Sequence, residues 1–327
     1  MLLQSIVDDW PNDSQIIAWV DIRARGRLVL PSNTKIFWIR PSFLSRLKAE
    51  ISLAFGSQPA GPFLFFHNLP PLLPVNGEII VFLQNRLLIE DSSLSNFSLR
   101  TRLRLILERA LLKILRHKVD VYYVQTPSMA ALLRGWYGGG SVDIRISSFA
   151  PPLSKGKGMS SREWDFVYVS DGEAHKNHKT LIESWIILGH NGLYPSLALT
   201  LSDRDKALRS WIDDKARSYN LNISDLGVLP RSEVSNLYDR AGAMIFPSVS
   251  ESFGLPLIEA RSAGIPILAG ELDFVRDVCD PVECFDPNSA VSIARAVRRF
   301  LQHPEAPIVP ESARVFLHSL VAPEKSS

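Results

Sequence analysis

Cysteine, long apolar runs and a basic N-terminus are scarce or missing in this 327-residue sequence. The two cysteines, Cys279 and Cys284, have no histidine beside them and make a poor zinc site, so we expect two reduced thiols. No apolar run reaches the roughly 18 residues that a membrane-spanning helix needs. The N-terminus, MLLQSIVDDWPND, carries acidic residues where a signal peptide carries basic ones. These absences predict a cytoplasmic protein.

Charge is divided unevenly between the two halves of the chain. Residues 1–150 hold 17 basic and 11 acidic side chains, a net charge of +6, whereas residues 151–327 hold 19 and 23, a net charge of −4. This asymmetry predicts two domains with different partners, and the chain is too long for a single core. No segment is typical of a nucleic-acid-binding module, so we expect no nucleic acid as a partner.

Short β-branched and aromatic runs alternate with helical patterns in the first half. The runs are bounded by Gly, Pro, Asn or Asp, which is typical of buried strands. A helix without proline or glycine is predicted over 99–118, and the alternation of strands and helices predicts a parallel sheet. The predicted strands are 14–22, 33–39, 61–67, 77–85 and 119–125.

The same alternation continues after a stretch rich in Pro, Gly, Ser and Lys at 149–163, which predicts an interdomain linker. We expect an α/β protein with two Rossmann-like open parallel-sheet domains, 1–150 and 151–303, that face each other across a cleft. Residues 304–327 are expected to return to the first domain. Ligands of such sheets bind beyond the carboxyl ends of the strands. The predicted strands are 164–170, 197–201, 223–229, 242–248 and 265–269, and the predicted helices are 178–189, 205–220, 232–241, 255–264 and 287–303.

The stretch SVSESFGLPLIEARSAG, residues 248–264, places two carboxylates around a glycine turn and a helix that starts with proline. Gly254 allows a tight turn and close approach of a ligand, and Pro256 suits a first helical turn. The amides of such a helix N-terminus stabilise a phosphate. Glu251 and Glu259 offer oxygens that suit the vicinal hydroxyls of a sugar or ribose. The alternative is a solvated loop residue and a favourable first-turn charge.

ESFGLPLIE resembles the E-x7-E signature of retaining, nucleotide-sugar-dependent glycosyltransferases of the GT-B fold, the family-4 type. Residues 227–278 as a whole resemble the donor domain of that family. In the first half, FFHNLPPLLP and IIVFLQNRLLIE resemble the members that build bacterial surface polysaccharides. The resemblance implies transfer of a hexosyl group, with retention and without a metal, from a nucleotide diphosphate sugar to a glycan or lipid-linked acceptor.

The resemblance also implies roles for particular residues. Glu251 would contact the donor sugar, Glu259 the ribose and Lys176 the diphosphate. The candidates for catalysis are Glu251, Lys176, Gln84 and His67. The candidates for donor binding are Glu259, Ser252, Phe253, Gly254, Leu255, Gly227, Val228, Leu229 and Asn85.

Three features depart from the family pattern. Asp171 stands where an arginine is expected on the diphosphate, and Gln84 or Asn85 stands where many members have a histidine. The N-terminus resembles the helix that follows the first strand and its glycine-rich loop. We therefore expect the first domain to lack its first strand.

Two charged patterns have competing interpretations. The D-x-D of Asp203 and Asp205 opens a helix, where aspartate is a common cap, so we expect no metal and no cofactor. Helix 99–118 carries seven Lys and Arg residues, which are typical either of a solvated outer face or of docking on an anionic membrane. Docking would make the protein peripheral on the inner face of the membrane.

Three classes of function remain from the sequence. The leading one is a glycosyltransferase of cell-surface polysaccharide synthesis. The alternative is a non-catalytic, sugar-nucleotide-binding relative, or a truncated inactive form of the same fold. A sugar-nucleotide epimerase of similar shape would reveal itself by isomerising its substrate without an acceptor.

Overall fold

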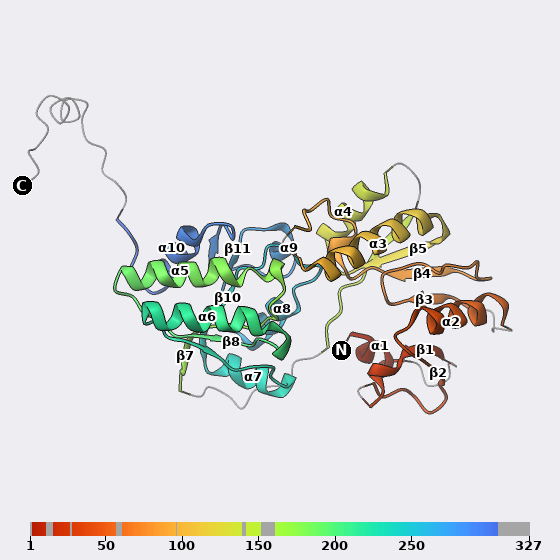
Figure 1. The fold of residues 1–327 in the computed structure, drawn as a ribbon, viewed down its shortest axis with the longest axis horizontal. Helices are drawn as coiled ribbons and strands as arrows, with labels where there is room; N and C mark the ends of the chain where they lie inside the picture. The colour runs from red at the N-terminus through yellow and green to blue at the C-terminus, as the bar shows by residue number, and fades with distance from the viewer. Residues whose placement is uncertain are drawn as a thin grey trace, which may run out of the picture.

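Two α/β units lie side by side in the computed structural model, one from each half of the chain (Figure 1). Every strand pairing in both units is parallel. The predicted fold class, two units built on open parallel sheets, is therefore confirmed. The structure describes residues 2–10, 16–26, 28–56, 61–95, 97–138, 142–151 and 161–306.

The N-terminal unit holds a four-stranded sheet in the order β3-β4-β5-β6 and a separate β1-β2 pair. The central strands β4 and β5 are rich in β-branched and aromatic residues, and Val81, Tyr122 and Val124 are fully buried. The strands are β1 (Ile17–Asp21), β2 (Lys35–Ile39), β3 (Phe63–Phe65), β4 (Ile79–Phe82), β5 (Val121–Val124) and β6 (Asp143–Ile146).

The β1-β2 pair shares no hydrogen-bonded ladder with the larger sheet in the part of the chain that the structure describes. Strands β1 and β3 each keep one edge with which no described strand pairs. Residues 2–10 hold helix α1 (Leu2–Asp8) and no strand. The expected lack of a first strand in this unit stays a prediction.

The longer helices of the N-terminal unit begin at hydroxyl caps. Ser42, Ser98 and Thr126 each accept a hydrogen bond from a backbone N–H of the first turn. The predicted helix 99–118 is confirmed as α3, whose Leu105 and Leu112 are fully buried. The helices are α2 (Phe43–Phe55), α3 (Leu99–Leu115) and α4 (Pro127–Tyr137), with 3-10 turns η1 (Ile22–Ala24), η2 (Arg86–Leu88) and η3 (Arg116–Lys118).

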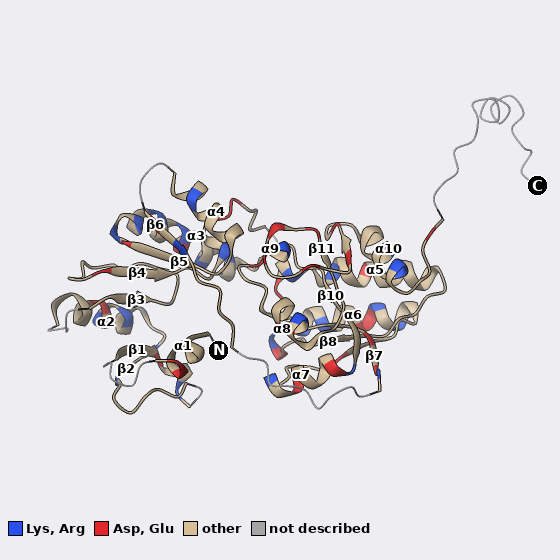
Figure 2. Cartoon of the chain, turned by 180° about the vertical axis from the view of Figure 1, so that it is seen from behind, with Lys and Arg blue, Asp and Glu red and all other residues tan. Residues whose placement is uncertain are grey.

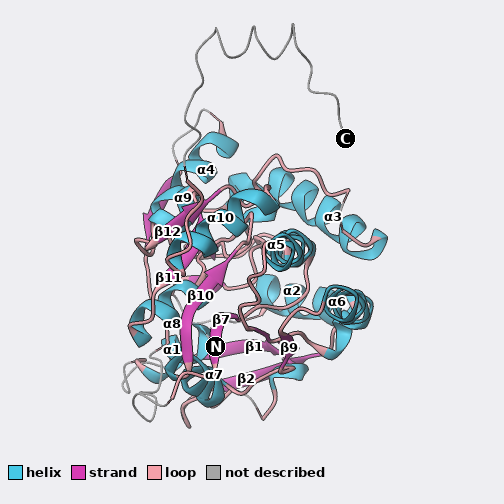
Figure 3. Ribbon diagram, turned by 90° about the vertical axis from the view of Figure 1, so that its left-hand side faces the viewer, coloured by secondary structure: helices cyan, strands magenta, loops and turns pink. Residues whose placement is uncertain are grey.

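The C-terminal unit is a six-stranded sheet in the order β12-β11-β10-β7-β8-β9, with helices on either side of the strands (Figure 3). Its strands are β7 (Trp164–Tyr168), β8 (Leu197–Leu199), β9 (Ile223–Asp225), β10 (Ala241–Phe246), β11 (Ile267–Gly270) and β12 (Glu283–Phe285). Its helices are α5 (His178–His190), α6 (Lys206–Tyr219), α7 (Arg231–Asp239), α8 (Leu255–Ala263), α9 (Asp273–Arg276) and α10 (Ala290–Phe300), with 3-10 turns η4 (Ala174–Lys176) and η5 (Asp203–Asp205).

Aromatic side chains fill the core of the C-terminal unit. Phe166 and Tyr168 of β7 meet Trp185 of α5 and Phe246 of β10 edge to face, with ring centroids 5.6 and 5.9 Å apart. All four side chains are at most 1% exposed. Such pairs bury large apolar areas in a fixed geometry, so they hold the two central strands and α5 together.

The sequence analysis did not predict two helices of the N-terminal unit, α2 and α4, or three short elements, α9, β6 and β12. Strand β6 reads Asp-Ile-Arg-Ile and is mostly exposed at a sheet edge, so it lacks the apolar run of a buried strand. The predicted linker at 149–163 falls largely on residues 152–160, and the predicted returning segment 304–327 falls on residues 307–327. Both of these stretches lie outside the described residues.

Candidate functional site

One asparagine joins the loop after β7 to the loop after β10. Asn177 has a left-handed backbone, φ 62° and ψ 33°, which asparagine adopts more readily than most residues. Its Nδ2 donates to the carbonyl oxygens of Pro247, at 3.2 Å, and Pro287, at 2.6 Å. Because β7 and β10 are parallel neighbours, their carboxyl ends meet at one edge of the sheet. Residues that follow them, among them Lys176, therefore converge there.

Lys176 and Glu251 form a close ion pair at this edge. Lys176 Nζ lies 2.6 Å from Glu251 Oε1, and the same oxygen accepts a hydrogen bond from Ser248 Oγ at 2.8 Å. The two side chains are 17% and 12% exposed, so the pair is largely shielded from water. An ammonium carries three donors, so Lys176 can keep Glu251 and still contact an anion. The structure thus brings together two residues that lie 75 positions apart in sequence.

Helix α8 begins next to this pair. Gly254 is its N-cap, with φ 70° and ψ 50°, and Pro256 lies in its first turn. A Cβ at Gly254 would meet Leu257 Cδ1 at 3.1 Å, and a left-handed backbone disfavours any L side chain. The side chain of Phe253 is buried in the core, so only its backbone can face a ligand. The amide end of α8 is suited to negative charge, as predicted for Gly254 and Leu255.

Glu259 is paired as well, but with a residue that the sequence analysis did not single out. Its Oε1 lies 3.3 Å from Arg231 Nη2 at the start of α7. Burial raises the pKa of Glu259, and the nearby guanidinium offsets part of that rise. Arg231 also donates to the carbonyl oxygen of Pro151, while its buried Nε has no hydrogen-bond partner among the residues that the structure describes. A carboxylate held in this way keeps oxygen atoms for a further donor such as a ribose hydroxyl.

The turn predicted to lie near a nucleotide base follows β9. Gly227 has φ 70°, and its N–H donates to Asp225 Oδ1 at 3.0 Å. Val228 is 70% exposed, and Leu229 packs against the core. The exposed Val228 side chain is free to contact a base, and the role predicted for this turn stays a prediction.

The candidates of the N-terminal unit all have hydrogen-bond partners within that unit, which are backbone groups for Gln84 and Asn85 and a side chain for His67. Gln84 Nε2 donates to the carbonyl oxygen of Phe66 at 2.9 Å, and Asn85 Oδ1 caps η2 by accepting the Leu87 N–H at 3.1 Å. His67 Nε2 lies 3.2 Å from Arg46 Nη2. Because a guanidinium only donates, that ring nitrogen accepts, and His67 is held neutral. Their predicted roles in catalysis and donor binding remain predictions.

Two acidic features of the sequence, Asp171 and the D-x-D, accept hydrogen bonds from nearby backbone N–H groups. Asp171, at the place of the expected arginine, is exposed, and its Oδ1 accepts the Glu173 N–H at 3.4 Å. In the D-x-D, Asp205 completes a capping box with Ser202 and accepts the Gly172 N–H at 3.1 Å. Asp205 thus serves as a cap that also holds the loop after β7. That the reaction needs no metal stays a prediction.

Arg86 and Glu90, which the sequence analysis quoted without a role, lie against the 248–254 loop. Arg86 N donates to Ser252 Oγ at 2.8 Å, and Glu90 Oε2 accepts from Ser250 Oγ at 3.0 Å. These bonds join the two units at the candidate site. No local pattern could reveal them, because the partners are 160 or more residues apart.

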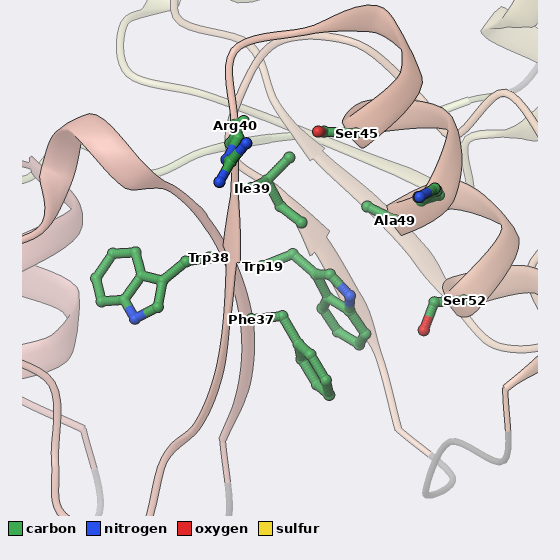
Figure 4. Close-up of a pocket in the computed structure, with 9 residues that line it drawn as sticks. Trp19, Phe37, Trp38, Ile39, Arg40, Ser45, Ala49 and Ser52 are labelled. Carbon is green, nitrogen blue, oxygen red and sulfur yellow. The ribbon is translucent and has the colours of Figure 1, made fainter.

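A pocket of about 440 Å³ opens elsewhere, between the β1-β2 pair and α2. Trp19 and Phe37 stack there with ring centroids 5.3 Å apart, opposite Ala49 and Ser52 of α2 (Figure 4). None of its lining residues belongs to the site described above. The apolar stacking makes this pocket part of the packing between α2 and the strand pair.

Residues 152–313 match the model of the family described as Glycosyl transferases group 1, so this second unit belongs to that family. O-antigen chain mannosyltransferase B of Escherichia coli is 29% identical over 145 residues, which is 42% of this chain and 36% of that protein. Glycogen synthase of Mycobacterium tuberculosis is 29% identical over 119 residues, 35% of this chain and 28% of that protein. The matched segments thus span about a third of these relatives.

Solved structures share the fold over most of the chain. Anabaena HepE, in complex with UDP and glucose, has a TM-score of 0.62 at 12% identity, covering 92% of this chain and 85% of that one. The UDP-forming alpha,alpha-trehalose-phosphate synthase of Burkholderia vietnamiensis has a TM-score of 0.58 at 14% identity, covering 82% and 72%. At such low identity the likeness shows the fold alone. The chain has the two-unit GT-B architecture expected from the sequence.

Proposed function

We propose that this protein is a retaining glycosyltransferase that uses a nucleotide diphosphate sugar. One observation carries the proposal: the Lys176–Glu251 pair lies at the carboxyl edge of the sheet, beside the amide end of α8. A diphosphate placed there meets an ammonium and helix amides, which stabilise a leaving group that gains negative charge. Glu251 then accepts hydrogen bonds from the sugar hydroxyls, and Glu259 from the ribose.

The acceptor in this proposal is a glycan or a lipid-linked glycan of surface-polysaccharide synthesis. The support is the likeness to a relative named as an O-antigen chain mannosyltransferase. The resemblance of ESFGLPLIE to retaining enzymes supports transfer with retention. Transfer without a metal is supported by the lysine and amides that the site offers for the diphosphate. The test is incubation with UDP-, GDP- and dTDP-sugars in the presence of EDTA, followed by analysis of the anomeric configuration of the product. Inversion, or loss of transfer on chelation, would contradict this part of the proposal.

An exposed apolar stripe on α3 supports docking on an anionic membrane. The stripe residues recur at helical spacing along one face, and basic residues fall on both sides of them in the helical pattern. Figure 2 shows the basic positions of α3 in blue. Such a helix lies in a membrane interface, where each basic residue contributes about 1 kcal/mol near anionic lipid. The stripe consists of Leu99, Leu103, Ile106, Leu107 and Ile114, whose side chains are 49–76% exposed. The basic residues that flank it are Arg100, Arg102, Arg104 and Lys113.

Vesicle sedimentation tests the docking. We expect the protein to bind vesicles that contain phosphatidylserine and not vesicles of phosphatidylcholine alone, with binding lost at high salt. Leu103→Ser with Leu107→Ser should abolish binding, whereas Val282→Ser, an exposed valine of the other unit, should not. Equal binding to both kinds of vesicle would contradict an electrostatic dock. Among the residues that the structure describes, no helix combines the length and apolarity that crossing a bilayer would take.

A second candidate function is a sugar-nucleotide-binding protein without catalysis. The observation that favours it is the exposed Asp171, which adds negative charge to the loop where the diphosphate is proposed to lie. Gln84 and Asn85 also favour a protein without catalysis, because Gln84 Nε2 and Asn85 Oδ1 are already hydrogen-bonded to backbone groups. Such a protein would bind the nucleotide sugar and release no nucleotide diphosphate when glycan acceptors are added.

A further inference from the structure

Two hydrogen bonds from the N-terminal unit flank the glutamate of the candidate site. We name residues 85–90 the clasp turn and residues 248–254 the donor loop. The backbone N–H of Arg86 donates to Ser252 Oγ at 2.8 Å, and Ser250 Oγ donates to Glu90 Oε2 at 3.0 Å. Glu251 lies between these two serines in sequence. The donor loop is therefore held from across the domain interface on both sides of its glutamate.

The clasp turn is itself rigidly braced. Arg86 Nε donates to Glu90 Oε1 at 2.8 Å, so the two oxygens of Glu90 are divided between Arg86 and Ser250. Arg109 of α3 donates to the carbonyl oxygens of Leu87, at 2.7 Å, and Glu90, at 2.8 Å. A charged side chain that bonds two backbone carbonyls fixes the turn more firmly than neutral bonds would. The clasp turn thus presents Glu90 to the donor loop in one orientation.

The surroundings of the clasp turn favour this closed arrangement. The side chains of Arg86 and Glu90 are 17% and 22% exposed, and the Arg86 guanidinium lies 5.8 Å from the ring centroid of Phe274 in the C-terminal unit. Charge-assisted bonds shielded from water are stronger than exposed ones. Ser128 N also donates to Asp277 Oδ2 at 2.8 Å, which adds a third hydrogen bond between the units.

We propose that Glu90 and Arg86 are positioning residues, which orient Glu251 toward the donor sugar only while the two units are closed. The inference rests on the proposed function for its ligand, and on the clasp geometry for its mechanism. When the units separate, Ser250 and Ser252 lose their partners and the donor loop relaxes. When they close, Ser250 and Ser252 are held from the N-terminal unit, so the backbone that carries Glu251 is fixed. Closure of the two units then also places Glu251 for its contact with the sugar.

Hydrogen exchange in the unliganded full-length protein tests the clasp without any nucleotide. Ser250→Ala removes the hydroxyl that donates the hydrogen bond to Glu90. Glu90→Gln removes the negative charge of the group that accepts this bond. A lost hydrogen bond to a charged group corresponds to roughly a tenfold change in an opening equilibrium, so amide exchange in the donor loop should become about tenfold faster. The matched controls are Ser262→Ala on α8 and Glu108→Gln, whose partner Arg104 lies on the same helix. Unchanged exchange in both clasp variants would overturn the proposal.

Calorimetric titration then asks whether the clasp acts through Glu251. The probes are UDP-glucose, GDP-mannose and dTDP-glucose, each compared with its nucleotide diphosphate. In Ser250→Ala we expect affinity for the bound nucleotide sugar to fall about tenfold while affinity for the diphosphate stays unchanged, because Glu251 is proposed to contact the sugar and not the diphosphate. In a Glu251→Ala background, Ser250→Ala should add no further loss, as coupled residues are not additive.

The outcomes separate the two proposals. Equal losses for nucleotide sugar and diphosphate, or additive losses in the double variant, would show that the clasp does not position Glu251. If no nucleotide sugar binds the unaltered protein, the proposed function fails. The exchange experiment alone then decides whether the clasp fixes the donor loop.

Discussion

Replacing Arg231 by methionine should destabilise the C-terminal unit in a way that depends on pH. The guanidinium of Arg231 lies 3.3 Å from Glu259, whose residue is only 8% exposed, and methionine keeps the length of the side chain without its charge. Breaking a buried ion pair by removing one partner costs about 3 kcal/mol, since a buried charge is left alone. For a unit of this size that loss lowers Tm by about 6–12 °C.

The pH dependence follows from the pKa of Glu259, which burial raises above its ordinary value of 4.5 while Arg231 offsets part of the rise. A folded state with a raised carboxyl pKa binds a proton that the unfolded chain does not, so stability falls as pH rises through that pKa. Without Arg231 the pKa rises further. The loss in Arg231→Met should therefore be smaller at pH 5 than at pH 8.

Thermal unfolding at pH 5 and pH 8 measures both effects. Arg217→Met is the matched control, because Arg217 pairs with Asp214 on the exposed face of α6. An exposed pair contributes about 0–1 kcal/mol, so this control should change little at either pH. An equal loss at both pH values, or a loss no larger than that of the control, would refute the account of a buried Glu259 held by Arg231.

Three further changes test other parts of the site. Gly254→Ala should cost about 1–2 kcal/mol in thermal unfolding, since its φ of 70° disfavours a side chain, and a neutral result would remove the steric argument. Burial lowers the pKa of His178 from 6.5 to about 4, so the unfolded chain takes up this proton first as pH falls. The free energy of unfolding should therefore drop by about 3 kcal/mol as the pH falls from 6.5 to 4, and His178→Phe should reduce this dependence on pH. An unchanged dependence on pH in His178→Phe would mean that another group causes the acid sensitivity. Asp171→Arg, which supplies the cation of the related glycosyltransferases, should tighten nucleotide diphosphate binding about fivefold in calorimetry, and no change would place the diphosphate away from this loop.

Local chemistry made part of the site predictable from sequence. The strand, the glycine turn and the proline-started helix around Gly254 are fixed by residues next to one another, and they lie where the pattern predicted. Only the family resemblance pointed to a shared site for Lys176 and Glu251, since it assigned one to the diphosphate and the other to the sugar of the same donor. Their contact depends on β7 and β10 being neighbours in the sheet, and that strand order was not predicted from the sequence.

Contacts between distant segments were beyond the reach of the sequence. The clasp between Glu90 and Ser250 depends on how the two units meet, and neither residue stands in a pattern that indicates a partner. Strand β12 is three residues long, so no periodicity can develop within it. Helix α4 could have been recognised, since Thr126 and Pro127 are a common start of a helix.

The most direct test of the central claim is calorimetric titration of Glu251→Gln with UDP-, GDP- and dTDP-sugars. We expect one nucleotide sugar to bind the unaltered protein and to bind Glu251→Gln at least tenfold more weakly, since a charge-assisted hydrogen bond to a sugar hydroxyl is lost. Glu233→Gln, an exposed carboxylate on α7, should bind as the unaltered protein does. Equal affinity in both variants, or no binding of any nucleotide sugar, would contradict the assignment.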